Sequence, residues 1–147
     1  MASPNVNIGA VQDSTLFLEL DMPHLQGNIL LVEDESFVLE VTAEILQAAG
    51  YQVLKARHAA EAMRIFRQNT DTIELLVLDV VLPGRNGWEL ARELIHLHPQ
   101  LKIVFVSGYP ENANTRTADF GHKVVYLPKP FSVNSLMQKV REAIVAQ

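Results

Sequence analysis

Four short apolar runs, each followed directly or within two positions by a polar residue, constrain the fold more than any other feature of this sequence. Each run is too short to form a helix on its own and too uniformly apolar for a strand with one wet face. Such runs predict strands that are buried on both faces of a parallel sheet. The runs are Ile29–Val32, Leu75–Leu78, Ile103–Val106 and Val124–Leu127.

The polar residues that follow the runs should meet at one edge of that sheet. Carboxyl ends of parallel strands lie side by side, and ligands of open α/β sheets bind just outside them. We therefore expect three carboxylates, one hydroxyl and one ammonium group to face a single crevice. These groups belong to Glu33, Asp34, Asp79, Ser107 and Lys129.

The segments between the runs have helical periodicity, as expected when helices cover both faces of a parallel sheet. A further strand is expected over Tyr51–Lys55, and the polar segment Glu111–Phe120 is expected to hold the least regular helix. The alternation predicts an α/β fold, a flavodoxin-like, doubly wound parallel sheet with strand order 2-1-3-4-5 and five helices. The stripe assigned to the core in the first helix consists of Val38, Val41, Ile45 and Ala48.

Length and composition are those of one globular domain. The 147 residues are 48% hydrophobic and 20% charged, which is enough to bury a sizeable core. We assign residues 28–147 to this domain. Residues 1–27 do not fit the alternation, and we assign them to a tail or linker.

Charge and cysteine content argue against several kinds of partner. The net charge is -5 and no cluster of Lys or Arg occurs, which argues against direct binding of nucleic acid. Without cysteine, neither a disulfide nor a thiolate metal site can form. Because no apolar stretch approaches ~20 residues and no signal-peptide pattern begins the sequence, we expect no membrane contact and a cytoplasmic location.

Three converging carboxylates predict a bound cation, because like charges a few ångströms apart raise each other's pKa. Oxygen ligands without His or Cys favour Mg²⁺, which often bridges a carboxylate to a phosphate. Asp79 could then act as a nucleophile and hold phosphate as an acyl phosphate, with Ser107 and Lys129 supplying a hydrogen bond and a positive charge. The motifs GxxxxGK[ST] and GxGxxG are absent, so the donor has to bring its own activated phosphate.

Each of these residues also has an ordinary structural explanation. Glu33 and Asp34 could cap a helix, and Asp79 could belong to a turn. Ser107 and Lys129 could lie in solvated loops. Their joint occurrence at strand ends of one sheet favours a shared site, because independent coincidences of this kind are improbable.

Taken together, the motifs resemble the receiver domain of two-component response regulators. The resemblance extends from Asn28 to about Ala146 and rests on Ile-Leu-Leu-Val-Glu33-Asp34, Leu-Val-Leu-Asp79-Val-Val-Leu-Pro-Gly, Val-Phe-Val-Ser107-Gly and Lys129-Pro130-Phe131. It implies a phosphorelay protein that is not an enzyme beyond catalysing its own phosphorylation and dephosphorylation. Its donor would be a phosphohistidine on a histidine kinase or a histidine phosphotransfer protein.

The same resemblance implies individual roles. Asp79 would accept the phosphoryl group, Ser107 would bind that group after transfer, and Lys129 would contact it from the other side. The implied Mg²⁺ ligands are Glu33, Asp34, Asp79 and the backbone carbonyl of Val81.

Further residues would switch or tune the domain. Tyr126 would turn inward as Ser107 moves toward the phosphate, and the Lys129–Pro130 bond would be cis. The positions that flank the phosphate are Val81 and Tyr109. Because neither side chain can orient an attacking water, we expect slow self-dephosphorylation.

The wider context is also predicted by resemblance. Residues 14–23 resemble the closing strand of a histidine-kinase ATP-binding domain, which would make this the C-terminal receiver of a hybrid sensor kinase. A stand-alone regulator is the alternative. Since the sequence stops at Gln147, we expect output either through a protein contact or through a part of the protein outside this sequence. A homodimer through the last strand and its flanking helices is one option.

Two other function classes stay open. A small Mg²⁺-dependent phosphatase or phosphotransferase would also use an aspartate nucleophile, but it predicts a cap insertion and an acid or base where the sequence has Val81. A receiver fold used only as an interaction module predicts the loss of a site residue, and none is lost.

Overall fold

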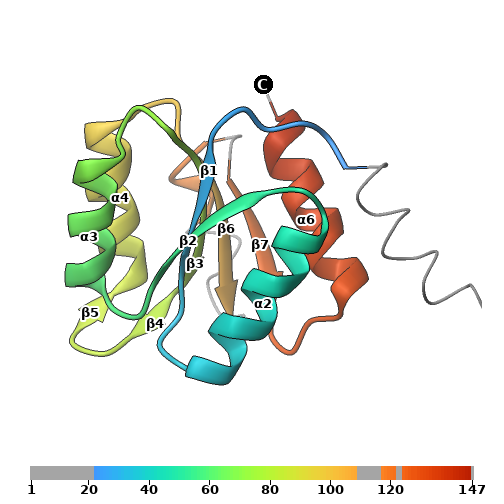
Figure 1. Cartoon of the computed structure of the whole chain (residues 1–147). Coiled ribbons are helices and arrows are strands. Elements are labelled where there is room, and N and C mark those ends of the chain that lie inside the picture. The colour runs from blue at the N-terminus through green and yellow to red at the C-terminus, as the bar shows by residue number, and fades with distance from the viewer. Residues whose placement is uncertain (1–21, 109–116, 122–123, 147) are drawn as a thin grey trace, which may run out of the picture.

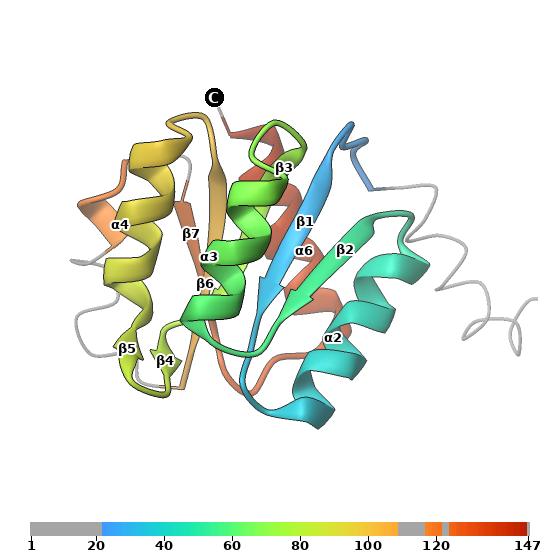
Figure 2. The same ribbon diagram turned by 60° about the vertical axis from the view of Figure 1, so that its left-hand side comes forward.

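A single parallel sheet lies between two layers of helices (Figure 1). The structure is a computed structural model that describes residues 22–108, 117–121 and 124–146. Each face of the sheet packs against its own pair of helices and forms a separate apolar core, as Figure 2 shows from a second side. The pairs are α2 (Ser36–Ala48) with α6 (Val133–Val145), and α3 (Ala59–Gln68) with α4 (Gly87–Leu97).

The strands of the main sheet are β1 (Asn28–Val32), β2 (Gln52–Ala56), β3 (Ile73–Asp79), β6 (Lys102–Ser107) and β7 (Val124–Pro128). All neighbouring pairs are parallel, and the order is β2-β1-β3-β6-β7. This is the order 2-1-3-4-5 expected from the sequence, so the predicted α/β fold is confirmed. Only β2 is displaced, beginning and ending one residue later than expected.

The described residues contain four helices, where the sequence predicted five. The remaining one was expected over Glu111–Phe120, which lies largely outside the described residues, so it stays a prediction. None of the helices in the described part of the chain is long and apolar enough to cross a membrane.

The side of α2 that faces the core differs from the predicted side. Val41 of the predicted stripe is 37% exposed, and Ala48 is also exposed. Both stripes have helical spacing, so periodicity alone could not separate them. The structure selects the stripe that carries two leucines, whose centre lies about 130° around the helix from the centre of the predicted stripe. Its buried residues are Leu39, Thr42, Ala43 and Leu46.

A short hairpin that the sequence did not predict follows Asp79. Its strands β4 (Val81–Leu82) and β5 (Arg85–Asn86) pair antiparallel, and Gly84 at the turn has a φ of 71°, which glycine adopts without strain. The next residue after β5, Gly87, donates its N–H to the Val80 carbonyl at 2.8 Å. A Cβ on Gly87 would lie 2.7 Å from the Asp79 carbonyl oxygen, so only glycine allows α4 to start this close to the end of β3.

Replacing Leu39 by alanine should lower the free energy of unfolding by about 2–4 kcal/mol, because loss of a buried leucine side chain leaves a cavity. Val41→Ala, on the exposed side of α2, is the matched control and should change it by less than about 1 kcal/mol. Urea denaturation followed by circular dichroism measures both. A larger loss for Val41→Ala than for Leu39→Ala would mean that α2 packs in the register first expected.

Candidate functional site

Side chains from four strand ends meet at the carboxyl edge of the sheet. Asp79 is the last residue of β3, and Ser107 is the last residue of β6. Glu33 comes directly after β1, and Lys129 comes directly after β7. These four strands are successive neighbours in the sheet. Glu33, Asp79 and Ser107 are only 4%, 6% and 2% exposed. The structure therefore brings together the residues that the sequence predicted to face one crevice.

The carboxylates of Glu33, Asp34 and Asp79 form one cluster. One oxygen from each lies within 4.8 Å of the others. The Lys129 ammonium reaches into this cluster, where its Nζ donates to Glu33 Oε1 at 2.9 Å and to Asp79 Oδ2 at 3.0 Å. Asp34 is half-buried and lines the solvent side of the cluster. One cation thus offsets part of the negative charge of three acidic groups.

Backbone N–H groups hold two of these carboxylates in position. The Val81 N–H donates to Asp79 Oδ1 at 3.0 Å, and the Glu35 N–H donates to Glu33 Oε2 at 3.1 Å. Each carboxylate therefore uses one oxygen for the backbone and the other for Lys129. This division fixes the plane of both groups before any ligand binds.

Charge and burial oppose each other in this cluster. Burial raises the pKa of the Glu33 carboxyl above its ordinary value, and the hydrogen bonds from Lys129 and the Glu35 N–H only partly counter that rise. Burial lowers the pKa of Lys129, but its hydrogen bonds to Glu33 and Asp79 outweigh this effect, and the net shift is upward. Lys129 therefore stays charged, while Glu33 gains from any further cation nearby.

An open cleft of about 630 Å³ gives access to Asp79 from solvent. Because Asp79 lines this cleft, a small phosphorylated group can approach its carboxylate without rearrangement of the sheet. The cleft is lined by Asp34, Glu35, Asp79, Val81, Leu82, Pro83, Gly108 and Lys129.

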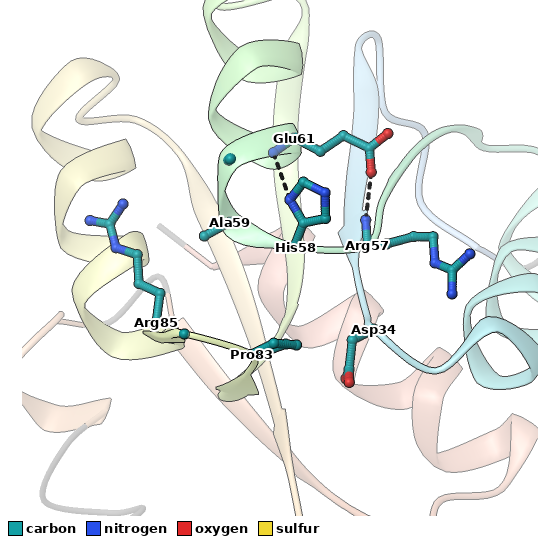
Figure 3. Close-up of a pocket in the computed structure, with 9 residues that line it drawn as sticks. Asp34, Arg57, His58, Ala59, Glu61, Pro83 and Arg85 are labelled. Atoms are coloured by element: carbon teal, nitrogen blue, oxygen red, sulfur yellow. Dashed lines mark hydrogen bonds between the residues drawn. The ribbon is translucent and has the colours of Figure 1, made fainter.

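A larger hollow of about 940 Å³ lies next to the cleft and shares Asp34 with it (Figure 3). In Figure 3, His58 Nδ1 accepts from the Glu61 N–H at 3.2 Å, and Glu61 Oε1 accepts from the Arg57 N–H at 2.8 Å. The His58 side chain thus caps the start of α3, and Glu61 accepts from the residue before that cap, an arrangement similar to a capping box. These two bonds involve the side chains of His58 and Glu61, and Asp79 does not line the hollow.

Ser107 and Tyr126 are joined by a hydrogen bond. The Tyr126 hydroxyl donates to the Ser107 carbonyl at 3.0 Å, and the Lys129 N–H donates to the same carbonyl at 2.8 Å. Any displacement of the Ser107 backbone therefore changes a contact of Tyr126. The Lys129–Pro130 bond is cis, as the resemblance implied.

This geometry does not test the roles that were assigned to individual residues from the sequence. Tyr109 lies outside the described residues. Val81 is 51% exposed and lines the cleft, but the role of its carbonyl as a metal ligand stays a prediction.

Sequence reasoning missed an apolar surface beside the cleft. Phe37 is 80% exposed, and it contributes with neighbouring residues to a shallow depression of about 440 Å³ that also includes Glu35 and Lys129. The sequence did contain a signal for this surface. The helix α2 carries two apolar stripes, and only one of them can face the sheet. We name this surface the α2 groove, and its apolar residues are Phe37, Val38, Val41, Pro130 and Phe131.

Known proteins share this fold. The sequence profile of the response regulator receiver domain matches residues 29–141. This chain belongs to the response regulator receiver domain family.

Relatives of this receiver domain occur both inside long proteins and as short ones. It is 40% identical over 121 residues to the sensor kinase CckA of Brucella abortus (strain 2308), covering 82% of this chain and 13% of CckA. It is 31% identical over 118 residues to the response regulator receiver protein CpdR of the same organism, covering 80% of this chain and 97% of CpdR. The crystal structure of the response regulator TrrA of Thermotoga maritima in complex with Mg²⁺ and BeF matches with a TM-score of 0.70 and 28% identity, covering 80% of this chain and 98% of that one.

The acidic cluster of this receiver domain fits a magnesium ion. Receiver domains bind Mg²⁺ at an acidic pocket, and here the pocket consists of Glu33, Asp34 and Asp79. All three offer carboxylate oxygens, the donor type that Mg²⁺ prefers. The upward pKa shift of Glu33 gives the electrostatic reason, since a divalent cation would offset the charge that burial makes costly.

Replacing Lys129 by methionine should lower the free energy of unfolding by about 2–4 kcal/mol at neutral pH without metal, because it leaves buried carboxylates without their cation. Added Mg²⁺ should recover part of this loss, since a ligand that binds only the folded state stabilises it. Urea titrations with and without Mg²⁺ measure both effects.

The control for this change is Lys139→Met, which removes a half-buried ion pair with Glu142 at 3.5 Å on the surface of α6. It should cost less than about 1 kcal/mol in either condition. A Lys129→Met protein that matches the wild type without metal would contradict the charge balance described here.

Proposed function

We propose that Asp79 accepts a phosphoryl group from a phosphohistidine of a histidine kinase or a histidine phosphotransfer protein in a two-component phosphorelay. The supporting observation is a nearly buried Asp79 carboxylate that lines an open cleft and lies 3.0 Å from the Lys129 ammonium. A carboxylate oxygen attacks phosphorus, the bond from phosphorus to the imidazole nitrogen breaks, and that nitrogen keeps the electron pair. The product is an acyl phosphate on Asp79.

The groups around Asp79 would stabilise the charge that moves during transfer. Lys129 already contacts the carboxylate that would accept the group, and Ser107 ends the neighbouring strand. Donors that are in place before reaction stabilise a transition state without reorganisation. Bound Mg²⁺ would offset the negative charge of the phosphoryl oxygens. Its proposed ligands are Glu33, Asp34, Asp79 and the Val81 carbonyl.

We further propose that the phosphoryl group acts as a ligand that favours one of two conformations of the domain. Movement of Ser107 toward the phosphate would change the hydrogen bond that its carbonyl accepts from Tyr126. Val81 and Tyr109 offer no side chain that orients a water, so the acyl phosphate should be long-lived.

The two alternative functions have less support. The second residue after Asp79 is Val81, which has no acid or base for a metabolite phosphatase. All five polar residues of the site are present, whereas use as an interaction module alone would not require them. We propose that the domain catalyses only its own phosphorylation and dephosphorylation.

The cellular context is also a proposal. The 40% identity with CckA, together with the resemblance of residues 14–23 to a kinase strand, supports a receiver in a cytoplasmic part of a hybrid sensor kinase. The match along 97% of CpdR supports the alternative of a stand-alone regulator.

Incubation with Mg²⁺ and acetyl phosphate should add one phosphoryl group to the wild type and none to Asp79→Asn, which lacks the nucleophile. Ser107→Ala should be labelled at least about tenfold more slowly, because one donor to the transferring group is lost. Intact-mass spectrometry follows all three proteins. Labelling of Asp79→Asn would identify a different acceptor, and hydrolysis of acetyl phosphate without accumulation of phosphoprotein would favour the phosphatase.

The phosphodonor protein should lie against the α2 groove. A phosphohistidine has to enter through the cleft, and the cleft and the groove share Glu35 and Lys129. A protein that covers the cleft therefore covers the groove as well. Phe37 supplies exposed aromatic area of the kind found at the centre of protein interfaces.

Phe37→Ala should slow transfer from a phosphorylated histidine phosphotransfer protein by about 5- to 30-fold, the effect of losing about 1–2 kcal/mol of contact energy. Labelling by acetyl phosphate should not change, because a small donor does not need the groove. Val145→Ala, at an apolar residue that is 56% exposed near the other end of the domain, is the control. An equal loss with both donors, or no loss with either, would contradict docking on this surface.

A further inference from the structure

The six residues before β1 are packed against the domain, although the sequence suggested a linker. Met22 is 9% exposed and belongs to the core between the sheet and the α2–α6 layer, and Leu25 packs against the same core. In Figure 1 this segment, drawn in blue, lies at the amino end of β1. The cleft with Asp79 lies at the carboxyl end of the strands, which is the other edge of the sheet. We name residues 22–27 the connector.

Side chains from two elements hold the first part of the connector. Tyr51, which joins α2 to β2, donates its hydroxyl to the Pro23 carbonyl at 2.6 Å. Arg141 of α6 donates through Nη2 to Met22 Sδ at 3.6 Å. Burial raises the pKa of Tyr51 to about 12, so its hydroxyl stays protonated and remains a donor at physiological pH. Apolar burial and two hydrogen bonds thus act on adjacent residues.

The last connector residue is fixed by the start of β3. The Gly27 N–H donates to Glu74 Oε1 at 2.8 Å, and the N–H of Asn28 donates to the Thr72 carbonyl at 2.6 Å. A Cβ on Gly27 would lie 2.1 Å from the Thr72 carbonyl oxygen, a distance that no real side chain tolerates. The path by which the chain enters β1 is therefore set by close backbone packing.

We propose that the connector is a docked part of the receiver unit, so that the chain enters this unit at the amino edge of the sheet. The folded unit would then begin at Met22 instead of Asn28. The five residues of β1 separate the two edges by about 17 Å. The described chain thereby enters the domain at the edge of the sheet opposite Asp79.

This placement bears on the phosphodonor, a consequence that rests on the proposed function. A phosphohistidine on the same polypeptide would have to pass from the amino edge to the carboxyl edge to reach Asp79. Because the connector is held at both of its ends, it cannot extend across the distance between the two edges of the sheet.

Distance measurements between two spin labels test the docking directly. The sequence has no cysteine, so introduced cysteines carry the only labels in the full-length protein. Gln26→Cys and Arg64→Cys place labels at exposed positions on the connector and on α3. Pulsed electron paramagnetic resonance should give one narrow distance distribution, which Met22→Ala combined with Tyr51→Phe should broaden. A distribution that is already broad with Met22 and Tyr51 intact overturns the proposal.

Thermal unfolding gives a readout that does not depend on labels. Met22→Ala should lower the midpoint by about 3–6 °C, since it removes buried contacts in a domain of this size. Leu97→Ala, at an apolar residue that is 42% exposed, is the control and should lower it by less than about 2 °C. A midpoint for Met22→Ala equal to that of the control contradicts docking. Labelling of Asp79 by acetyl phosphate in the same samples reports on the proposed function alone, so failure of one proposal is distinguishable from failure of the other.

Discussion

Buried negative charge at the carboxyl edge of the sheet is the constraint on which the rest of the site depends. Lys129 lies 96 residues after Glu33 and 50 residues after Asp79, yet its ammonium bonds to both. These bonds are possible because β1, β3 and β7 lie within four successive strands of one sheet. A buried ion pair of this kind is often no more stable than an apolar replacement. The charges are therefore better explained by chemistry at Asp79 than by stability of the fold.

The apolar strands supply the rigid support that such a site requires. Strands buried on both faces lose their core contacts if they slip by one residue, so the strand ends are held in register. Close packing continues past the end of β3, where Gly87 allows α4 to begin against the Asp79 carbonyl. The ring of Trp88, the next residue, lies 4.3 Å from the ring of Phe105, two residues before Ser107. The start of α4 thus packs through an aromatic contact against β6, the strand that ends at Ser107.

Features that follow from the order of apolar and polar residues along the sequence were predictable. Features that depend on which of several surfaces packs in the folded domain were not. The four runs predicted strands because a short apolar run has few other uses in a domain of this size. The face of α2 was predicted wrongly because two apolar stripes compete and only packing against the sheet decides between them. Likewise, Lys129 was expected at the phosphate, but its bond to Glu33 depends on a distance that spacing does not reveal. The connector escaped notice because Met22 and Leu25 are isolated apolar residues without periodicity.

The two edges of the sheet differ in a way that suits a switch. At the carboxyl edge, charge is concentrated and Glu33 has a raised pKa, so this end responds strongly to a bound cation or phosphoryl group. At the amino edge, the connector is held by apolar burial, by the neutral hydrogen bond from Tyr51 to Pro23, and by one hydrogen bond each with Arg141 and Glu74. Those contacts lie a strand's length from Asp79. Under the proposed function, a change of charge at the site would alter the contacts of Ser107 and Tyr126 while the connector stays in place.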